Sequence, residues 1–147
     1  MGIRTLNPTT PGNRFSTRSD VSEITANQPE KKLTKALRKS GGRNNKGRIT
    51  VRHRGGGHRR RYRIIDFQRN KTDRLATVAT IDYDTNRSAN LALLHYSDGE
   101  KRYILLSFGL KVGDPGVSSS SAKLNIGNAL PLKSITNGLT VHNAQLT

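Results

Sequence analysis

Residues 75–106 read LATVATIDYDTNRSANLALLHYSDGEKRYILL, and this stretch decides the fold. Short apolar runs with β-branched and aromatic residues alternate along it with polar turn sequences. Asp98 and Gly99 stand between two apolar runs, which is a strong signal for a β-hairpin. The polar sequence DTNRSAN, at residues 84–90, separates two other strand candidates. The stretch therefore predicts at least three consecutive strands joined by turns.

Further strand candidates lie on both sides of this stretch. They are YRIIDF at residues 62–67, GNALPL at residues 127–132 and GLTVHNAQL at residues 138–146. Five or six short strands with turns every ~8–12 residues are typical of a small β-barrel or sandwich. We therefore expect an all-β fold for residues 62–147.

The first 61 residues have a different composition. Residues 41–62 contain almost no apolar side chains and cannot form a core, so we expect a Gly/Arg-rich arm that becomes ordered only on its partner. The preceding sequence PEKKLTKALRKSGG, at residues 29–42, predicts a short helix that ends at Gly41. We thus expect residues 1–61 to form an extended segment ahead of the barrel.

The positive charge of the chain is concentrated in one segment. The formal net charge is +16, and residues 31–71 hold 16 Lys or Arg against one acid, Asp66. Such a block repels itself unless a polyanion is present. Nucleic acid is therefore the favoured partner, and a merely solvated basic tail is the alternative.

A glycine triplet lies inside the densest part of this charge, in the sequence RHRGGGHRRRYR at residues 52–63. Glycine permits positive φ angles and a close approach of the backbone to a phosphate, whose oxygens accept from its N–H group. The stretch lacks the G-x-x-x-x-G-K-[ST] pattern of a nucleotide-binding P-loop. We interpret the triplet as a turn that lies against RNA, and a flexible linker is the alternative.

Most candidate RNA-binding residues are arginines, because a guanidinium group binds phosphate bidentately and stacks on bases. Asn44 and Asn45 either read base edges or hold a turn. His53 and His58 are expected to stack on RNA or hydrogen-bond to it rather than bind zinc, because no third ligand lies nearby. The predicted RNA-binding residues are Arg43, Asn44, Asn45, Lys46, Arg48, Arg52, His53, Arg54, Gly55, Gly56, Gly57, His58, Arg59, Arg60, Arg61, Arg63, Arg69 and Lys71.

Composition and motifs disfavour other classes of function. The chain has no cysteine, which excludes disulfides, thiolate nucleophiles and Cys-ligated zinc. No apolar run is long enough to span a bilayer, and we expect no membrane partner. Asp82 and Asp84 adjoin a turn, which favours Asp for local reasons, and the serine run 118–121 has no base placed by any pattern. We therefore expect no enzymatic activity and no cofactor, with Mg²⁺ present only through bound RNA.

Three stretches together resemble a known family. They are SGGRNNKGRITVRHRGGGHRRRYRIIDFQRNK at residues 40–71, IDYDTNRSANLALLHYSDGEKRYIL at residues 81–105, and GNALPL…TVHNAQL within residues 127–146. They closely resemble the N-terminal half of the bacterial-type ribosomal protein two of the large subunit, the universal "L-two" family. The resemblance implies an rRNA-binding extension at residues 1–61 and a five-stranded oligonucleotide-binding (OB) barrel at residues 62–147.

The resemblance also implies a role and partners. Family members are structural constituents that bind large-subunit rRNA near the peptidyl-transferase region and support assembly and translation. They continue into an SH3-like barrel with a basic tail, whereas this chain ends at VHNAQLT, about where the first barrel ends. We therefore expect a split protein whose second barrel is a separate chain, with other large-subunit proteins as further partners. NPTTPG and KSGGRNN resemble alphaproteobacterial members, which favours a mitochondrial ribosome over the bacterial cytoplasm or a plastid.

Arg87 ends the sequence YDTNR, where the usual family wording is YDPNR, so Thr85 stands in place of proline. The resemblance implies that Arg87 contacts rRNA, and a surface ion pair with Asp82 or Asp84 is the alternative. A rival to the ribosomal role is a free-standing OB module that binds single-stranded RNA, as a chaperone would. Such modules stack bases on aromatic side chains, and the chain holds only seven Phe and Tyr residues.

Overall fold

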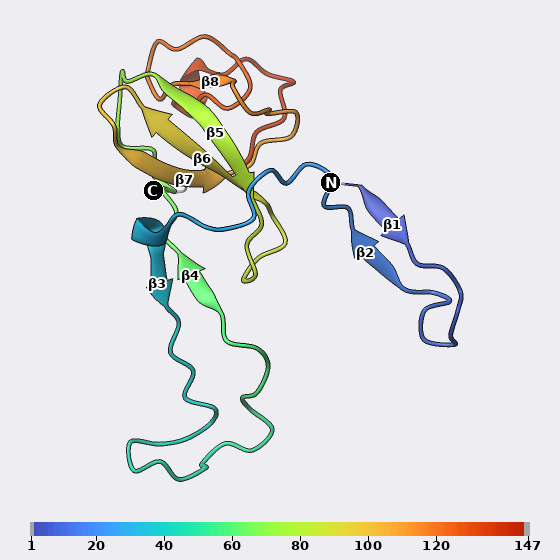
Figure 1. Cartoon of the computed structure of the whole chain (residues 1–147). Helices are drawn as coiled ribbons and strands as arrows, with labels where there is room; N and C mark the ends of the chain where they lie inside the picture. Colours follow the sequence, from blue (N-terminus) through green and yellow to red (C-terminus); the bar gives the residue numbers. More distant parts are fainter. Residues whose placement is uncertain (1, 146–147) are drawn as a thin grey trace.

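The computed structural model describes residues 2–145, and its centre is a curled four-stranded sheet (Figure 1). The strands are Ala76–Asp82 (β5), Leu91–Tyr96 (β6), Lys101–Leu105 (β7) and Pro115–Gly116 (β8), in the order β7-β6-β5-β8. Every neighbouring pair is antiparallel. The three strands predicted from the deciding stretch are confirmed as β5, β6 and β7.

The turn between β6 and β7 forms as predicted. The Gly99 N–H donates to the Tyr96 carbonyl oxygen at 3.0 Å, and the Tyr96 N–H donates to the Glu100 carbonyl oxygen at 2.9 Å. Gly99 has a φ of +81°, which costs glycine little because it has no Cβ. The turn fixes the register of the hairpin, in which His95 faces Lys101.

A bulge bends the sheet towards a half-barrel, and a fifth segment extends its edge. The register of β5 against β6 shifts between Val78 and Thr80, and such a bulge bends a strand and increases its twist. At the β7 edge, Ile65 forms a parallel bridge with Tyr103, and the Asp66 N–H donates to the Tyr103 carbonyl oxygen at 2.9 Å. A fifth segment thus extends the sheet beyond β7. The expected all-β class and OB-type barrel are confirmed.

Apolar side chains cover both faces of the sheet, because alternate residues of β6 point to opposite faces and nearly all are apolar. Burying one such Leu or Val side chain stabilises the fold by about 1.5–3 kcal/mol. One face carries Ala76, Val78, Ala92, Leu94, Tyr96, Ile104 and Leu110. The other carries Ile65, Leu91, Leu93 and Tyr103, with Leu33 and Leu105 packed against them.

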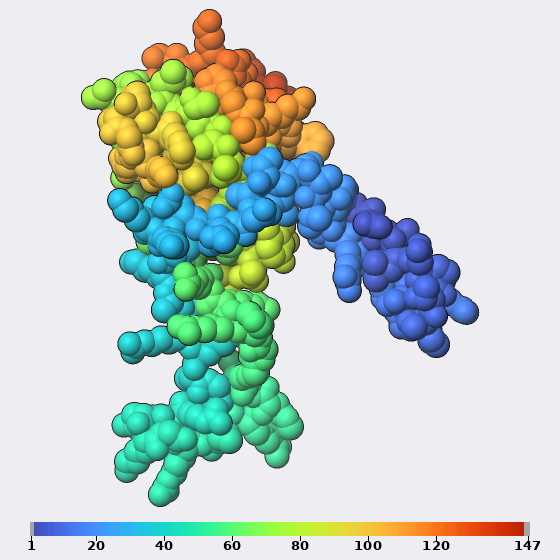
Figure 2. Space-filling model, viewed as in Figure 1, coloured from blue at the N-terminus to red at the C-terminus, as the bar shows by residue number. Residues whose placement is uncertain are grey.

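Two hairpins project from the compact barrel (Figure 1, Figure 2). Ile3–Thr5 (β1) pairs with Thr17–Ser19 (β2), and Thr34–Ala36 (β3) pairs with Arg61–Arg63 (β4). We call residues 37–61, the long loop after β3 together with the first residue of β4, the basic arm. The ladder of β3 and β4 crosses the predicted domain boundary after residue 61, and the Ile64 N–H donates to the Leu33 carbonyl oxygen at 2.8 Å, so backbone hydrogen bonds join the segment before the arm to the barrel.

The short helix predicted for residues 29–42 is wrong. Lys31–Leu33 (η1) forms a single 3-10 turn, and β3 follows at once. Leu33 packs on the sheet and Thr34 pairs with Arg63, so tertiary contacts outweigh the propensity of a helix too short to be stable alone. Within the described residues, no helix has the length and apolar character needed to cross a membrane.

The two strands predicted near the C-terminus are also wrong. Within residues 127–132 only Ala129 forms a bridge, with Ser118, and Leu132–Ser134 is a 3-10 turn (η2). Residues 138–145 contain no strand, and residues 146–147, the end of the predicted domain, lie outside the described residues. Pro131 lacks a backbone N–H and so cannot donate to a ladder. These segments instead form loops over the β8 end of the sheet (Figure 1).

Candidate RNA-binding surface

The basic arm carries ten Lys or Arg residues and no acid. Every residue from 43 to 61 is exposed. No cation of the arm forms an ion pair with a carboxylate anywhere in residues 2–145. The charge of the arm is therefore available to an external anion. The ten cations are Arg38, Lys39, Arg43, Lys46, Arg48, Arg52, Arg54, Arg59, Arg60 and Arg61.

Asn44 shapes the tip of the arm. Its Oδ1 accepts hydrogen bonds from the N–H groups of Lys46 and Arg48, both at 3.0 Å, and its own N–H donates to the Arg48 carbonyl oxygen at 2.9 Å. Of the two roles considered for Asn44, the structure shows the turn. Asn45 is exposed beside it, and base contact by Asn45 remains a prediction.

The glycine triplet at residues 55–57 has positive φ throughout, from +74° to +110°. Gly55 lies against Gly41 of the opposite limb of the arm, since a Cβ added to Gly55 would lie 3.0 Å from the Gly41 Cα. Gly42 is more restricted still, because its Cβ would lie 2.1 Å from the Val51 carbonyl oxygen. The expected positive φ of the triplet is confirmed, and the absence of side chains also lets the two limbs of the arm touch.

A cleft of about 420 Å³ opens between the two limbs beside this contact. The Lys39 ammonium group spans it and donates to the carbonyl oxygens of His58 at 3.3 Å and Gly56 at 3.5 Å. Sequence reasoning assigned Arg54 and the triplet to RNA but missed the rest of the lining. The available signal was a second glycine pair flanked by basic residues in RKSGGR. The missed lining residues are Arg38, Lys39, Ser40, Gly41 and Gly42.

The root of the arm is an ion cluster around Asp84, which is fully buried. Asp84 accepts hydrogen bonds from Arg63 Nη1 at 3.0 Å, from Arg87 Nε at 2.7 Å and from the Asn86 N–H at 3.0 Å. Asn86 Nδ2 donates in turn to the Arg61 carbonyl oxygen at 2.7 Å. The cluster ties the loop after β5 to β4, and so it holds the base from which the arm leaves the barrel.

Arg63 and Arg87 were both predicted to contact RNA, and the structure places both in this cluster. Arg63 is only 8% exposed. The alternative considered for Arg87, an ion pair with Asp84, is the arrangement observed. The guanidinium carbon of Arg87 also lies 5.8 Å from the Tyr62 ring centre and 5.9 Å from that of Phe67, within the range of cation–π attraction. Contact of either arginine with rRNA remains a prediction.

Arg69 and Lys71 also bind groups of their own chain. The two Nη atoms of Arg69 donate to the Gly127 carbonyl oxygen at 3.2 and 3.3 Å, and burial lowers the pKa of Arg69. The Lys71 ammonium pairs with Asp98 and Glu100, and hydrogen bonds to these carboxylates raise the pKa of Lys71. Both side chains hold loops together, and their contact with rRNA remains a prediction.

The remaining candidate residues either bond to groups of their own chain, as Asp82 does, or lie exposed on the arm, as His53 and His58 do. Asp82 accepts hydrogen bonds from the Tyr103 hydroxyl at 2.6 Å and the Thr80 hydroxyl at 2.8 Å. Burial and the bond to Asp82 raise the pKa of Tyr103. His53 and His58 are exposed on the arm. Within residues 2–145 there is no group of three or more His, Cys, Asp or Glu side chains that could hold a metal ion.

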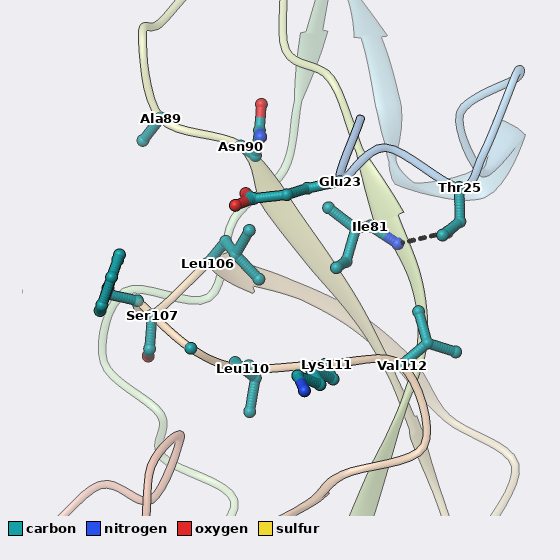
Figure 3. A pocket seen from close by; sticks show the side chains of 12 residues that line it. Glu23, Thr25, Ile81, Ala89, Asn90, Leu106, Ser107, Leu110, Lys111 and Val112 are labelled. Atoms are coloured by element: carbon teal, nitrogen blue, oxygen red, sulfur yellow. Dashed lines mark hydrogen bonds between the residues drawn. The ribbon is translucent and has the colours of Figure 1, made fainter. Parts of the chain in front are cut away.

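A second cavity, of about 460 Å³, lies on the barrel between the segment after β2, the end of β5 and the loop after β7 (Figure 3). Its walls are mainly apolar and include Ile81, Leu106 and Leu110. Glu23 and Lys111 are its charged lining residues, so the lining has no net charge. This cavity is therefore separate in character from the basic surface.

Residues 30–118 match the protein family described as "Ribosomal Proteins L2, RNA binding N-terminal domain". The match covers more than half of the chain and includes the basic arm, the Asp84 cluster and all four strands of the main sheet. An RNA-binding domain requires an exposed cationic surface without internal neutralisation, and the arm supplies one. The chain belongs to the family of the RNA-binding N-terminal domain of ribosomal proteins L2.

Proposed function

We propose that this chain is a structural constituent of the large ribosomal subunit that binds large-subunit rRNA near the peptidyl-transferase region and supports assembly and translation. The observation that carries the proposal is the basic arm, whose ten cations have no carboxylate partner within residues 2–145. A segment that cannot neutralise itself requires a polyanion. The family relation supports rRNA as that polyanion.

In the proposed role the barrel positions the arm and the arm binds. Arginine side chains bind phosphates bidentately and stack on bases. Each neutralised phosphate releases counterions, which drives binding and makes it depend on salt. The Asp84 cluster holds the root of the arm, so the arm enters the RNA from a fixed base. The chain performs no chemistry in this role, and any Mg²⁺ arrives with the rRNA.

The distribution of cations and aromatic side chains favours folded rRNA over free single strands. Tyr103 is fully buried and Tyr96 is 6% exposed. The rings of Tyr62 and Phe67 already flank the Arg87 guanidinium. Free-standing OB modules need accessible rings on which successive bases stack. The basic arm, with its ten cations, contains no Phe, Tyr or Trp side chain at all, which supports recognition through phosphates and shape rather than base stacking.

We also propose a mitochondrial ribosome as the location, because NPTTPG and KSGGRNN resemble alphaproteobacterial family members. The bacterial cytoplasm and a plastid are the alternatives. Other large-subunit proteins are proposed as neighbours. A separate chain that carries the second barrel of the family is the further partner for which the experiment below searches.

Sedimentation tests these proposals directly. Native extract, prepared separately from mitochondria and from the remaining cell material, is run through a magnesium-containing sucrose gradient with mass spectrometry of each fraction. We expect the chain to peak with mitochondrial large subunits, in equal amount to other large-subunit proteins and to a separate chain carrying the second barrel. If it stays near the top, free or on small RNAs, the ribosomal role is wrong and a free-standing RNA-binding module replaces it.

A further inference from the structure

The cleft between the limbs of the basic arm has the backbone geometry of an anion site. Gly41 and Gly42 line it from one limb, and Gly55 and Gly56 line it from the other. All four have positive φ. Successive N–H groups in such turns form concavities that bind anions.

The N–H groups of these four glycines are free to donate. Within residues 2–145 none of them donates a hydrogen bond to another group of the chain. The backbone around them is nevertheless held in place, because the Gly42 carbonyl oxygen accepts from the N–H groups of Thr50 at 2.9 Å and Val51 at 3.1 Å. These two backbone hydrogen bonds fix the position of Gly42 at the cleft.

The side chains of the cleft supply charge of one sign. Arg38, Lys39 and Arg54 line it, and no carboxylate does. Lys39 joins the limbs through its bonds to carbonyl oxygens of the opposite limb, and this contact places its positive charge beside the glycines. The volume of about 420 Å³ lies in the range of small-ligand pockets.

We infer that this cleft is a phosphate-binding site that clamps the backbone of an RNA strand between the two limbs of the arm. The glycine N–H groups and the side chains of Lys39 and Arg54 are the donors. The inference rests on the proposed function and deepens it. It assigns Lys39, Gly41 and Gly42 to one specific contact, whereas the proposed function requires only a general positive field.

Paired charge removals test the clamp in the full chain, with the large-subunit rRNA of the source organism as the probe. The variant Lys39→Gln with Arg54→Gln alters the cleft, and Lys46→Gln with Arg52→Gln removes the same two residue types elsewhere on the arm. Each pair should lower the salt slope of binding by about 1.5, since two phosphate contacts are lost. The cleft pair should lose at least tenfold more affinity than the control pair at every salt concentration.

Equal losses for the two pairs overturn the clamp while leaving rRNA binding by the arm intact. If the unaltered chain does not bind rRNA, the proposed function fails instead, so the two failures are distinguishable. A second comparison avoids charge altogether. Gly55→Ala, at a φ of +110°, places a Cβ 3.0 Å from the Gly41 backbone, whereas Gly47→Ala, at a φ of +74°, meets nothing within 4 Å. We expect a tenfold loss of affinity for Gly55→Ala only, and equal binding by the two variants contradicts the clamp.

Inorganic phosphate distinguishes the source of the ligand. The full chain labelled with ¹⁵N-glycine is titrated with phosphate at constant ionic strength, and the amide signals of the four cleft glycines are compared with that of Gly47. Selective shifts together with the losses in RNA binding show a site that accepts any phosphate group. Losses in RNA binding without shifts show a site that needs the phosphodiester of an RNA chain, which also supports the clamp. Shifts without any loss in RNA binding overturn it.

Discussion

Arg102 and Arg60 carry the same guanidinium group into different surroundings. Arg102, on β7, donates to Glu100 and to Asp66, at 2.6 and 2.8 Å. Arg60, in the basic arm, has no carboxylate partner within residues 2–145. Arg63 and Lys71, two other cations outside the arm, also have carboxylate partners. Location relative to the carboxylates of the chain, more than the number of cations, therefore defines the surface available to RNA.

The physical reason lies in the cost of removing charge from water. A buried cation is costly unless a partner and hydrogen bonds compensate it, so the barrel keeps a carboxylate beside Arg63. A cation on the exposed arm incurs no such cost until a ligand covers it. Removal of a partner in the barrel should then lower stability, and removal of a cation from the arm should lower only binding.

The largest expected effect is that of Asp84→Asn. The substitution leaves Arg63 buried without a countercharge and weakens the hold on Arg87. Breaking a buried ion pair in this way costs about 3–5 kcal/mol of unfolding free energy. Urea denaturation followed by circular dichroism measures it. Asp73→Asn is the matched control, because Asp73 is exposed and forms no ion pair within residues 2–145, and it should change stability by less than about 0.5 kcal/mol.

Substitutions of apolar residues should show the same contrast between the barrel and the arm, with a slightly smaller loss of unfolding free energy. Leu94, on β6, is 1% exposed, and Leu94→Ala should cost about 2–5 kcal/mol through lost burial and a cavity. Ile49, in the arm, is 64% exposed, and Ile49→Ala should fall within about 0.5 kcal/mol of the unaltered chain. Both are measured by urea denaturation. A similar loss for Ile49→Ala would show that the arm belongs to the cooperative unit of the barrel.

Removal of arm charge should reverse the pattern. Arg59→Ala, Arg60→Ala and Arg61→Ala together should lower the salt slope of rRNA binding by about two to three and the affinity by about a hundredfold at low salt. The unfolding free energy should not change. Filter binding at a series of salt concentrations measures the slope. Lys101→Gln with Arg102→Gln is the control, since both cations already have carboxylate partners. An unchanged salt slope in the triple variant refutes the assignment of these three arginines to the RNA-binding surface.

These contrasts also show what the sequence could predict. Local signals sufficed for β5 to β7 and for the turn at Asp98 and Gly99, because alternation and turn chemistry act over a few residues. The exposed basic arm followed from charge and glycine content alone. The pairing of Arg63 with Asp84 joins residues 21 apart, and no local pattern predicts such a contact. Leu33 was wrongly assigned to a helix because its contact with the sheet is also long-range and no local pattern shows it. That contact favours the extended backbone of β3, which follows Leu33.

The cleft was missed for a different reason. Gly41 was interpreted as the end of a helix, which removed it from the RNA-binding candidates before its partner on the opposite limb was known. Its contact with Gly55 appears only when the two limbs come together. A glycine next to basic residues has two meanings, a helix end or a close backbone approach, and the local sequence does not separate them.

The smallest expected effect is an acid sensitivity that arises from ion pairs of the barrel and not from the basic arm. Hydrogen bonds from Lys71 hold the pKa of Asp98 below its usual 3.8, and bonds from Arg102 and then Lys71 hold the pKa of Glu100 below its usual 4.5. A carboxyl group whose pKa is lower in the folded state stabilises the fold at pH values above its unfolded pKa. That contribution is lost as the pH falls through the folded pKa. The unfolding free energy should therefore decline from about pH 5 towards pH 2, by a small amount because both groups are exposed.

Lys71→Gln should flatten this decline, since it removes the partner shared by the two carboxylates, and urea denaturation between pH 2 and pH 7 measures it. Lys46→Gln removes the same charge from the arm, which has no carboxylate, and should leave the decline unchanged. If Lys46→Gln flattened the decline as much as Lys71→Gln does, the acid sensitivity would reflect the net charge of the whole chain. Paired carboxylates would then not distinguish the barrel from the arm. A decline that stays as steep in Lys46→Gln but becomes shallower in Lys71→Gln assigns this part of the acid sensitivity to ion pairs that the barrel has and the arm lacks.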